Sequence, residues 1–222
     1  MGRILSFILL LILFKTEAQT SVLNMADSLY ANGNYSKALE SYKTYSNQKE
    51  VYDKIAKAYM AIGNYDQALL NYELSIKANP EDALLKFEYA RLLSKTKKYE
   101  TAIKVFNDLV VVDDENPNYH YELGLVLEKL EDSTAINRFR SAYELDQTHQ
   151  KAIYRIAKYF LKHRKYDLVK EYVDKGLETY ENNIELINLK AQNYYNKQDY
   201  DNAIIWFKKL IALGESTGFI YE

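Results

Sequence analysis

A short phrase that returns at an almost constant spacing restricts the fold of this sequence more than any other feature. The phrase runs through a turn, a tyrosine, two residues, an alanine, three residues and an aromatic, as in GNYSKALESY at 33–42. Its anchor falls at Tyr35, Tyr65, Tyr99, Ser133, Tyr166 and Tyr200. Such regular spacing is typical of arrays in which each unit buries its apolar face only against its neighbours. The sequence therefore predicts a stack of six like units.

Each unit is predicted to contain two helices. Nine residues before the anchor a small residue recurs, at Ala26, Ala56, Ala90, Gly124, Ala157 and Ala191. Three residues after it comes an apolar or aromatic residue, at Leu29, Tyr59, Leu93, Leu127, Phe160 and Tyr194. Spacings of three, four and seven place residues on one face of a helix. With only seven glycines and two prolines in 222 residues, a loop-rich β-fold is disfavoured. We therefore expect a first helix (helix A), a tight turn and a second helix (helix B).

These motifs resemble the tetratricopeptide repeat (TPR) family over residues 19–217. The unit at 49–82 matches the family pattern best, with Ala56, Tyr59, Gly63, Tyr65, Ala68, Tyr72 and Pro80. The fourth unit lacks the turn glycine, and the fifth has Val169 and Val173 in place of alanine and an aromatic. The resemblance implies an all-α solenoid, a right-handed superhelix of stacked antiparallel hairpins with a concave inner face. The expected units are 19–48, 49–82, 83–116, 117–149, 150–183 and 184–217.

The N-terminal segment 1–18 is typical of a secretory signal peptide. Arg3 precedes an apolar run at 4–14, which is broken only by a serine. Thr16 and Ala18 place small residues at the −3 and −1 positions, which predicts cleavage between Ala18 and Gln19. The run is shorter than the roughly 20 residues needed to span a bilayer. We expect export to the bacterial periplasm or cell envelope; an uncleaved signal would instead tether the protein to the membrane.

The last residues, 218–222, continue the pattern of a helix A beyond the sixth unit. Two alternatives are open. The segment lies back on the sixth unit as a cap, or it starts a further helix of a longer array. In the second case a downstream domain could define the biological role.

No pattern of catalytic or ligand-binding chemistry accompanies the repeats. The net charge is −2, cysteine is absent, and the three histidines are scattered. There is no glycine-rich phosphate loop and no nucleophile or zinc-protease motif. The carboxylate clusters at 113–115 and 131–132 fall in turns between helices. We expect no enzymatic activity, no cofactor, no metal and no nucleic-acid partner.

The resemblance implies a binding face for other proteins or extended peptides, because TPR ligands usually contact helix A from the concave side. The candidates are Phe87, Arg91, Lys95, Tyr121, Leu125, Tyr154, Lys158, Lys162, Gln192 and Tyr195. Three aromatics in successive units, flanked by cations, would suit an acidic or C-terminal peptide segment. The leading hypothesis is a scaffold or adaptor of the cell envelope. The alternatives are an exported sensor module of a longer signalling protein and a glycan- or peptidoglycan-binding module.

Overall fold

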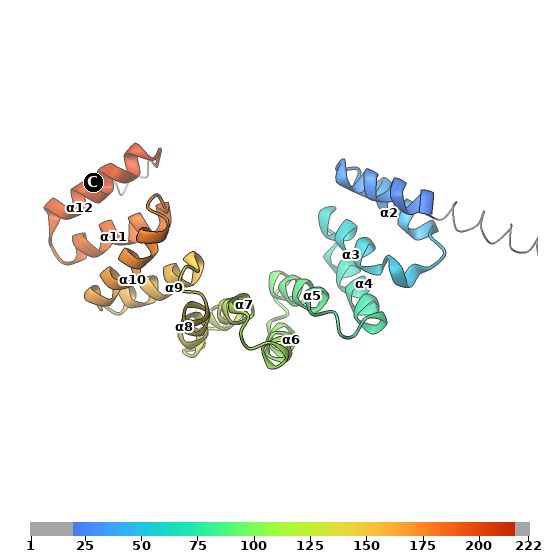
Figure 1. Ribbon diagram of the computed structural model, residues 1–222, viewed down its shortest axis with the longest axis horizontal. Coiled ribbons are helices and arrows are strands. Elements are labelled where there is room, and N and C mark those ends of the chain that lie inside the picture. The colour runs from blue at the N-terminus through green and yellow to red at the C-terminus, as the bar shows by residue number, and fades with distance from the viewer. Residues whose placement is uncertain (1–19, 216–222) are drawn as a thin grey trace, which may run out of the picture. The chain divides into compact units, whose positions relative to one another are not determined.

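The computed structural model describes residues 20–215 (Figure 1). The predicted signal segment with its cleavage site at Ala18 and Gln19, and the segment 218–222, lie outside these residues. Within the described range every regular element is a helix. The predicted all-α architecture is therefore confirmed. None of the helices in this range combines the length and the apolar character needed to cross a membrane.

The helices follow one another as hairpins of a helix A and a helix B. After the helical residues 20–31 come α2 Tyr35–Thr44, the 3-10 turn η1 Gln48–Glu50, α3 Tyr52–Ala61, α4 Tyr65–Ala78, α5 Ala83–Lys95, α6 Tyr99–Val112, α7 Pro117–Lys129, α8 Ala135–Leu145, α9 Gln150–Lys162, α10 Tyr166–Thr179, α11 Ile184–Asn196 and α12 Tyr200–Ala212. Hairpin partners pack together, as in α3 with α4, α7 with α8, α9 with α10 and α11 with α12. Successive hairpins stack through α2 with α3, α4 with α5, α8 with α9 and α10 with α11. The predicted stack of antiparallel hairpins is thus present.

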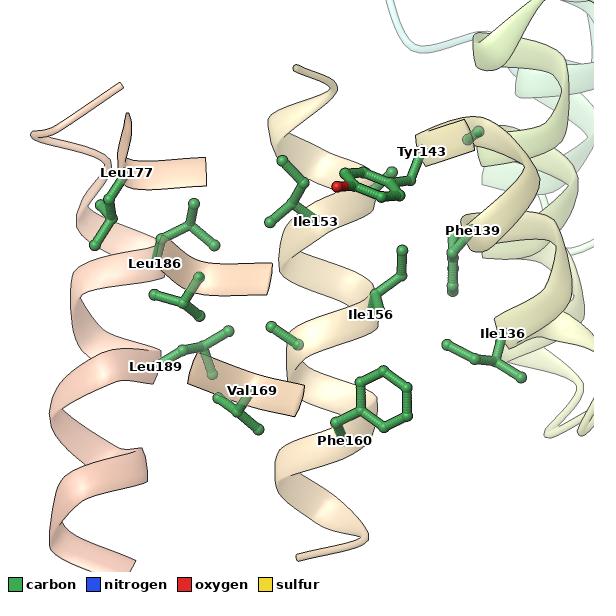
Figure 2. Packing of buried hydrophobic residues seen from close by; sticks show 14 of the residues in the cluster. Ile136, Phe139, Tyr143, Ile153, Ile156, Phe160, Val169, Leu177, Leu186 and Leu189 are labelled. Carbon is green, nitrogen blue, oxygen red and sulfur yellow. The ribbon is translucent and has the colours of Figure 1, made fainter. Parts of the chain in front are cut away.

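The chain divides into two compact units, residues 1–105 and 106–222, with the boundary inside α6. In the first unit Tyr42, Val51 and Ile55 belong to a buried cluster. In the second unit a larger cluster is built around α9. Figure 2 shows Ile153, Ile156 and Phe160 of this helix between the α8 side chains on one side and those of α10 and α11 on the other. Burying these side chains against neighbouring hairpins supplies the hydrophobic stabilisation that a single hairpin lacks.

The recurrent small residue of helix A lies where helix B crosses it. The alanines at this place, 26, 56, 90, 157 and 191, are fully buried. In the fourth hairpin the place is held by Gly124, where an added Cβ would lie 2.7 Å from a ring carbon of Phe139 in α8. This distance is well inside normal carbon contact. The small residue is therefore a packing requirement, as the sequence pattern predicts.

Every turn between helix A and helix B contains one residue in the left-handed backbone conformation. These residues are Gly33, Gly63, Lys97, Glu131, Arg164 and Gln198, with φ between 55° and 79°. The amide of the next residue donates to the carbonyl of the apolar residue near the end of helix A; for example, Asn34 N–H donates to Leu29 at 2.9 Å. This is the Schellman arrangement that closes a helix. Only two of the six turns use glycine, so the turn geometry is more uniform than the residue types.

Ion pairs join the A helices of neighbouring hairpins. In the first unit Lys54 Nζ lies 2.7 Å from Asp27 Oδ1, and Lys57 Nζ lies 3.2 Å from Glu88 Oε2. The Tyr42 hydroxyl also donates to Asp27 at 2.7 Å. Burial raises the pKa of this carboxyl, but its bonds with Lys54 and Tyr42 outweigh burial and leave the pKa below its ordinary value. The stack is therefore held by polar contacts along its A helices as well as by its apolar core.

Candidate functional site

The candidate site is an open groove on the second unit, formed by the A helices α7, α9 and α11 and the start of α8. It encloses about 1260 Å³. Its apolar lining includes Ile136 and Phe139 of α8, Leu161 of α9 and Leu189 of α11, all of which also belong to or pack on the buried cluster. The groove therefore has a rigid apolar floor, and its polar walls decide what it can bind.

The wall formed by α9 carries positive charge. Tyr154, Lys158 and Lys162 are four residues apart, which places them in one column on the helix surface. The Lys158 ammonium lies 5.6 Å from the centre of the Tyr154 ring, and the Arg155 guanidinium lies 5.8 Å from it. The sequence of α9 contains no acidic residue. Within residues 20–215 neither Lys158 nor Lys162 has a carboxylate within 4.0 Å, so both ammonium groups can pair with a ligand.

The wall formed by α11 carries side-chain amides. Asn188, Gln192 and Asn196 also follow one another at four-residue spacing and line the groove. The Gln192 amide nitrogen donates to Asn188 Oδ1 at 2.9 Å. This bond leaves the Asn188 amide nitrogen to donate and the Gln192 amide oxygen to accept. Such a pair matches the carbonyl and N–H groups of a peptide main chain.

Acidic side chains lie mainly at the α7 side of the groove. Glu128 Oε2 is 2.8 Å from Arg155 Nη1, which joins α7 to α9. Behind this pair lies Tyr121, whose pKa is raised by burial and lowered in part by the adjacent Arg155 guanidinium. Asp132 accepts hydrogen bonds from the backbone and the hydroxyl of Thr134, and these lower the pKa of its carboxyl. Glu128 and Asp132 are thus engaged in bonds, whereas the α9 lysines are not. Glu131 and Glu185 also line the groove.

The structure brings four of the predicted binding residues together at the groove: Tyr154, Lys158, Lys162 and Gln192. Leu125 is half-buried against the core cluster. Tyr195 is exposed on α11 with its ring 5.7 Å from that of Tyr200, outside the groove lining. Arg155 also lines the groove, and sequence reasoning missed it. The absence of acidic residues along α9 is the sequence feature that could have indicated a basic wall there.

Tyr121 departs from the expectation that it forms a surface aromatic. Its side chain is buried, with 7% exposed, and its ring lies 5.8 Å from Phe139 and 5.0 Å from His149. The ring packs between α8 and the cap of α9, so it belongs to the core behind the groove. The expected ladder of three exposed aromatics therefore does not form.

The remaining candidates lie on α5 in the first unit. Phe87, Arg91 and Lys95 share one face of this helix, and the Arg91 guanidinium lies 5.9 Å from the Phe87 ring centre. The Lys95 ammonium lies 4.6 Å from the ring centre of Tyr65 in α4. Both cations are on exposed residues, and each is close to an aromatic ring. These three candidates therefore belong to the first unit, whereas the groove belongs to the second.

Comparison with known proteins supports the assignment of the repeats. The tetratricopeptide repeat family matches residues 54–120 and 184–215. The chain is 23% identical over 202 residues to the TPR repeat-containing protein YpiA of Bacillus subtilis (strain 168). This match covers 86% of the chain but 47% of the relative, so the chain spans about half the relative's length.

Solved structures share the fold at low sequence identity. The structure of pilF from Pseudomonas aeruginosa is 18% identical with a TM-score of 0.71, covering 89% of this chain and 92% of pilF. YrrB, described as a TPR protein with an unusual peptide-binding site, is 19% identical with a TM-score of 0.58, covering 80% of this chain and 91% of YrrB. Residues 54–120 and 184–215 are therefore tetratricopeptide repeats, and the described chain has the stacked-hairpin fold of TPR proteins.

Proposed function

We propose that this protein is a non-catalytic scaffold that binds an extended segment of a partner protein in the groove of its second unit. The observation that carries the proposal is the pair of facing columns, cations on α9 and amides on α11, above an apolar floor. The columns come from two neighbouring A helices of a rigid stack. A preformed site of this kind requires little ordering of the protein when a ligand binds.

Each wall has its own part in recognition. The free amide groups of Asn188 and Gln192 bond the main chain of the partner, which gives affinity without regard to side chains. Lys158 and Lys162 attract carboxylates, so the preferred segment is acidic or ends in its C-terminal carboxylate. The exposed part of the Tyr154 ring supplies apolar contact. The description of YrrB as a peptide-binding TPR protein is consistent with a peptide ligand.

The test uses the full chain and two short fluorescein-labelled peptides of equal length, one of alternating Gly and Glu and one of alternating Gly and Lys. Anisotropy should report binding of the acidic peptide only. The double substitution Lys158→Glu and Lys162→Glu should weaken binding at least tenfold, since about 1.4 kcal/mol corresponds to a factor of ten. The matched control is Lys151→Glu, which changes the same charge on the same helix outside the groove lining.

Two results would contradict this proposal. Equal weakening per charge by Lys151→Glu would mean that only the general field of α9 is involved. Equal binding of the acidic and basic peptides would remove the role of the lysine column. The amide wall is tested separately by Asn188→Ala with Gln192→Ala, which should weaken binding without changing the preference for acidic peptides.

Export to the bacterial cell envelope completes the proposal. It is supported by the charge, the apolar run and the small-residue spacing of segment 1–18. Mass spectrometry of the protein from its native host should find Gln19 as the mature N-terminus in an envelope fraction. Recovery of the intact N-terminus in the cytosol would refute export. Crosslinking in the same fraction would identify the partner.

A further inference from the structure

The cationic wall of the groove already holds one carboxylate of the chain itself. Glu128 of α7 accepts a hydrogen bond from Arg155 of α9, with Oε2 2.8 Å from Nη1. Both residues line the groove, and their side chains are 41% and 27% exposed. The pair is thus within reach of a ligand in the groove, and Glu128 shows what kind of group this wall binds.

The bond between Glu128 and Arg155 is a weak form of the contact between arginine and a carboxylate. A single guanidinium nitrogen donates to the carboxylate, whereas such pairs are strongest when two parallel bonds form. The Arg155 Nε is buried and has no hydrogen-bond partner among residues 20–215. Partly exposed ion pairs generally contribute little to stability. A carboxylate from outside the chain can therefore take the place of Glu128 at low cost.

Arg155 lies on the same face of α9 as the two lysines of the groove. Arg155, Lys158 and Lys162 are three and four residues apart, which makes them neighbours on the helix surface. At 1.5 Å per residue they are spaced by about 4.5 and 6 Å along the helix axis. In an extended peptide every second side chain points to the same side, and such side chains are about 6.6 Å apart. Acidic residues at alternate positions of an extended segment can therefore reach all three cations.

We propose that Arg155 is the third cation of the binding wall and that Glu128 occupies it until a ligand binds. The inference rests on the proposed function of the groove and defines its ligand more narrowly. The ligand is an extended segment of a partner protein that has acidic residues at every second position and lies along α9. Two of its carboxylates bind Lys158 and Lys162, and a third replaces Glu128 at Arg155. A segment with fewer carboxylates leaves Glu128 in place and gains nothing from Arg155.

Removing the competing carboxylate tests the exchange. The probe is the fluorescein-labelled peptide of alternating Gly and Glu, titrated into the full chain and followed by anisotropy. Glu128→Gln should tighten its binding about two- to fivefold, because the ligand then no longer has to displace a partly exposed ion pair. The matched control is Glu131→Gln, which removes the same charge from the groove lining. Among residues 20–215 Glu131 has no cation within 4.0 Å, so this control reports only the general field.

A double-mutant cycle separates the ion pair from the general field. Arg155→Gln should weaken binding of the same peptide. In the Arg155→Gln background Glu128→Gln should no longer tighten binding, because no guanidinium is left to release. The effect of Glu131→Gln should be the same with and without Arg155. Both members of the pair are partly exposed, so the variants should retain the far-UV circular dichroism of the parent.

The spacing of the carboxylates is tested on the peptide. An isomer with the same numbers of Gly and Glu, but with all its glutamates in one run, presents half as many carboxylates on each side when it is extended. This isomer should therefore bind several-fold more weakly than the alternating peptide. Equal binding of the two isomers would overturn the alternate spacing.

The remaining outcomes distinguish this inference from the groove itself. If neither acidic peptide binds the parent chain, the proposed function fails and the exchange fails with it. If the alternating peptide binds but Glu128→Gln weakens its binding or leaves it unchanged, the exchange is wrong and the groove remains the binding site. Tightening by Glu128→Gln that persists in the Arg155→Gln background would have the same meaning. A structure of the complex in which Glu128 still bonds Arg155 would also overturn the exchange.

Discussion

Replacing Gly124 by alanine should destabilise the fourth hairpin, although the same change in an ordinary helix is stabilising. Gly124 lies in α7, and its missing Cβ would be 2.7, 2.8 and 3.2 Å from three ring carbons of Phe139. The ring is buried, with 3% exposed, so it has no free space into which to move. Either the ring or the whole of α8 must withdraw from α7.

The magnitude follows from two opposed effects. Gly to Ala in a helix interior is worth about 1 kcal/mol in favour of alanine. Carbon atoms pack best at about 3.5–4.0 Å, so the new methyl needs a displacement on the order of 1 Å. Overpacking of this kind costs roughly 1–3 kcal/mol. Subtracting the gain in helix propensity from this cost, we expect a net loss of up to about 2 kcal/mol in the free energy of unfolding.

The double variant Gly124→Ala with Phe139→Leu separates the two effects. Leucine removes the ring edge that the methyl meets, so alanine should then stabilise by roughly 0.5–1 kcal/mol through helix propensity alone. Urea unfolding followed by far-UV circular dichroism gives both free energies, provided that Trp206 fluorescence shows the same transition. Stabilisation by Gly124→Ala in the presence of Phe139 would refute the close approach of the ring to α7.

Three further changes test the turns, the stacking and a helix cap. Lys97→Gly should stabilise by roughly 0.5–1 kcal/mol because glycine adopts φ of 63° without strain; thermal unfolding measures this, and a lower midpoint would contradict it. Burial raises the pKa of Asp174, but hydrogen bonds from Lys170 and Lys190 outweigh burial and lower it. The lowered pKa adds stability that is complete above the ordinary value of 3.8 and is lost as the pH falls below it. Asp174→Asn should therefore reduce the pH dependence of the urea midpoint between pH 2 and 5. His149 caps α9 by accepting a hydrogen bond from the Ala152 N–H, and burial lowers the pKa of its imidazole, so the free energy of unfolding should fall as the pH drops below 6.5. His149→Asn should keep the cap, worth about 1 kcal/mol, and remove this pH dependence. A pH profile of stability that is unchanged in the variant would refute the assignment.

The repeat period and the small-residue positions were sufficient to predict the helical hairpins, because both report contacts that recur in every unit. The left-handed turns at Lys97, Glu131, Arg164 and Gln198 were not predictable from residue type. Each is held by the Schellman hydrogen bonds and by the packing of its hairpin, which outweigh a local cost of about 1 kcal/mol. Where tertiary contacts impose a backbone conformation, the residue type at that position gives little indication of it.

The groove was predicted in part, for a related reason. The resemblance to TPR proteins implied that Tyr154, Lys158, Lys162 and Gln192 lie on the concave side of helix A, and all four line the groove. A position within the repeat does not fix how deeply its side chain is buried. Tyr121 shares the direction but contacts Phe139, the ring admitted by the nearby Gly124, and so lies within the core. Burial of one aromatic thus depended on a glycine one turn away on the same helix.

The ion pairs between neighbouring A helices make part of the contact between hairpins dependent on ionic strength. Asp27 with Lys54 and Lys57 with Glu88 in the first unit, and Glu128 with Arg155 in the second, each connect one hairpin to the next. The Debye length is about 8 Å at physiological salt and about 3 Å at 1 M, so only concentrated salt shortens it to the 2.7–3.2 Å that separate the charges of these pairs. Concentrated salt should therefore weaken the contacts between successive A helices, while the apolar core keeps the helices packed. The contact between two hairpins thus combines an apolar contribution that tolerates salt with an ionic contribution that does not.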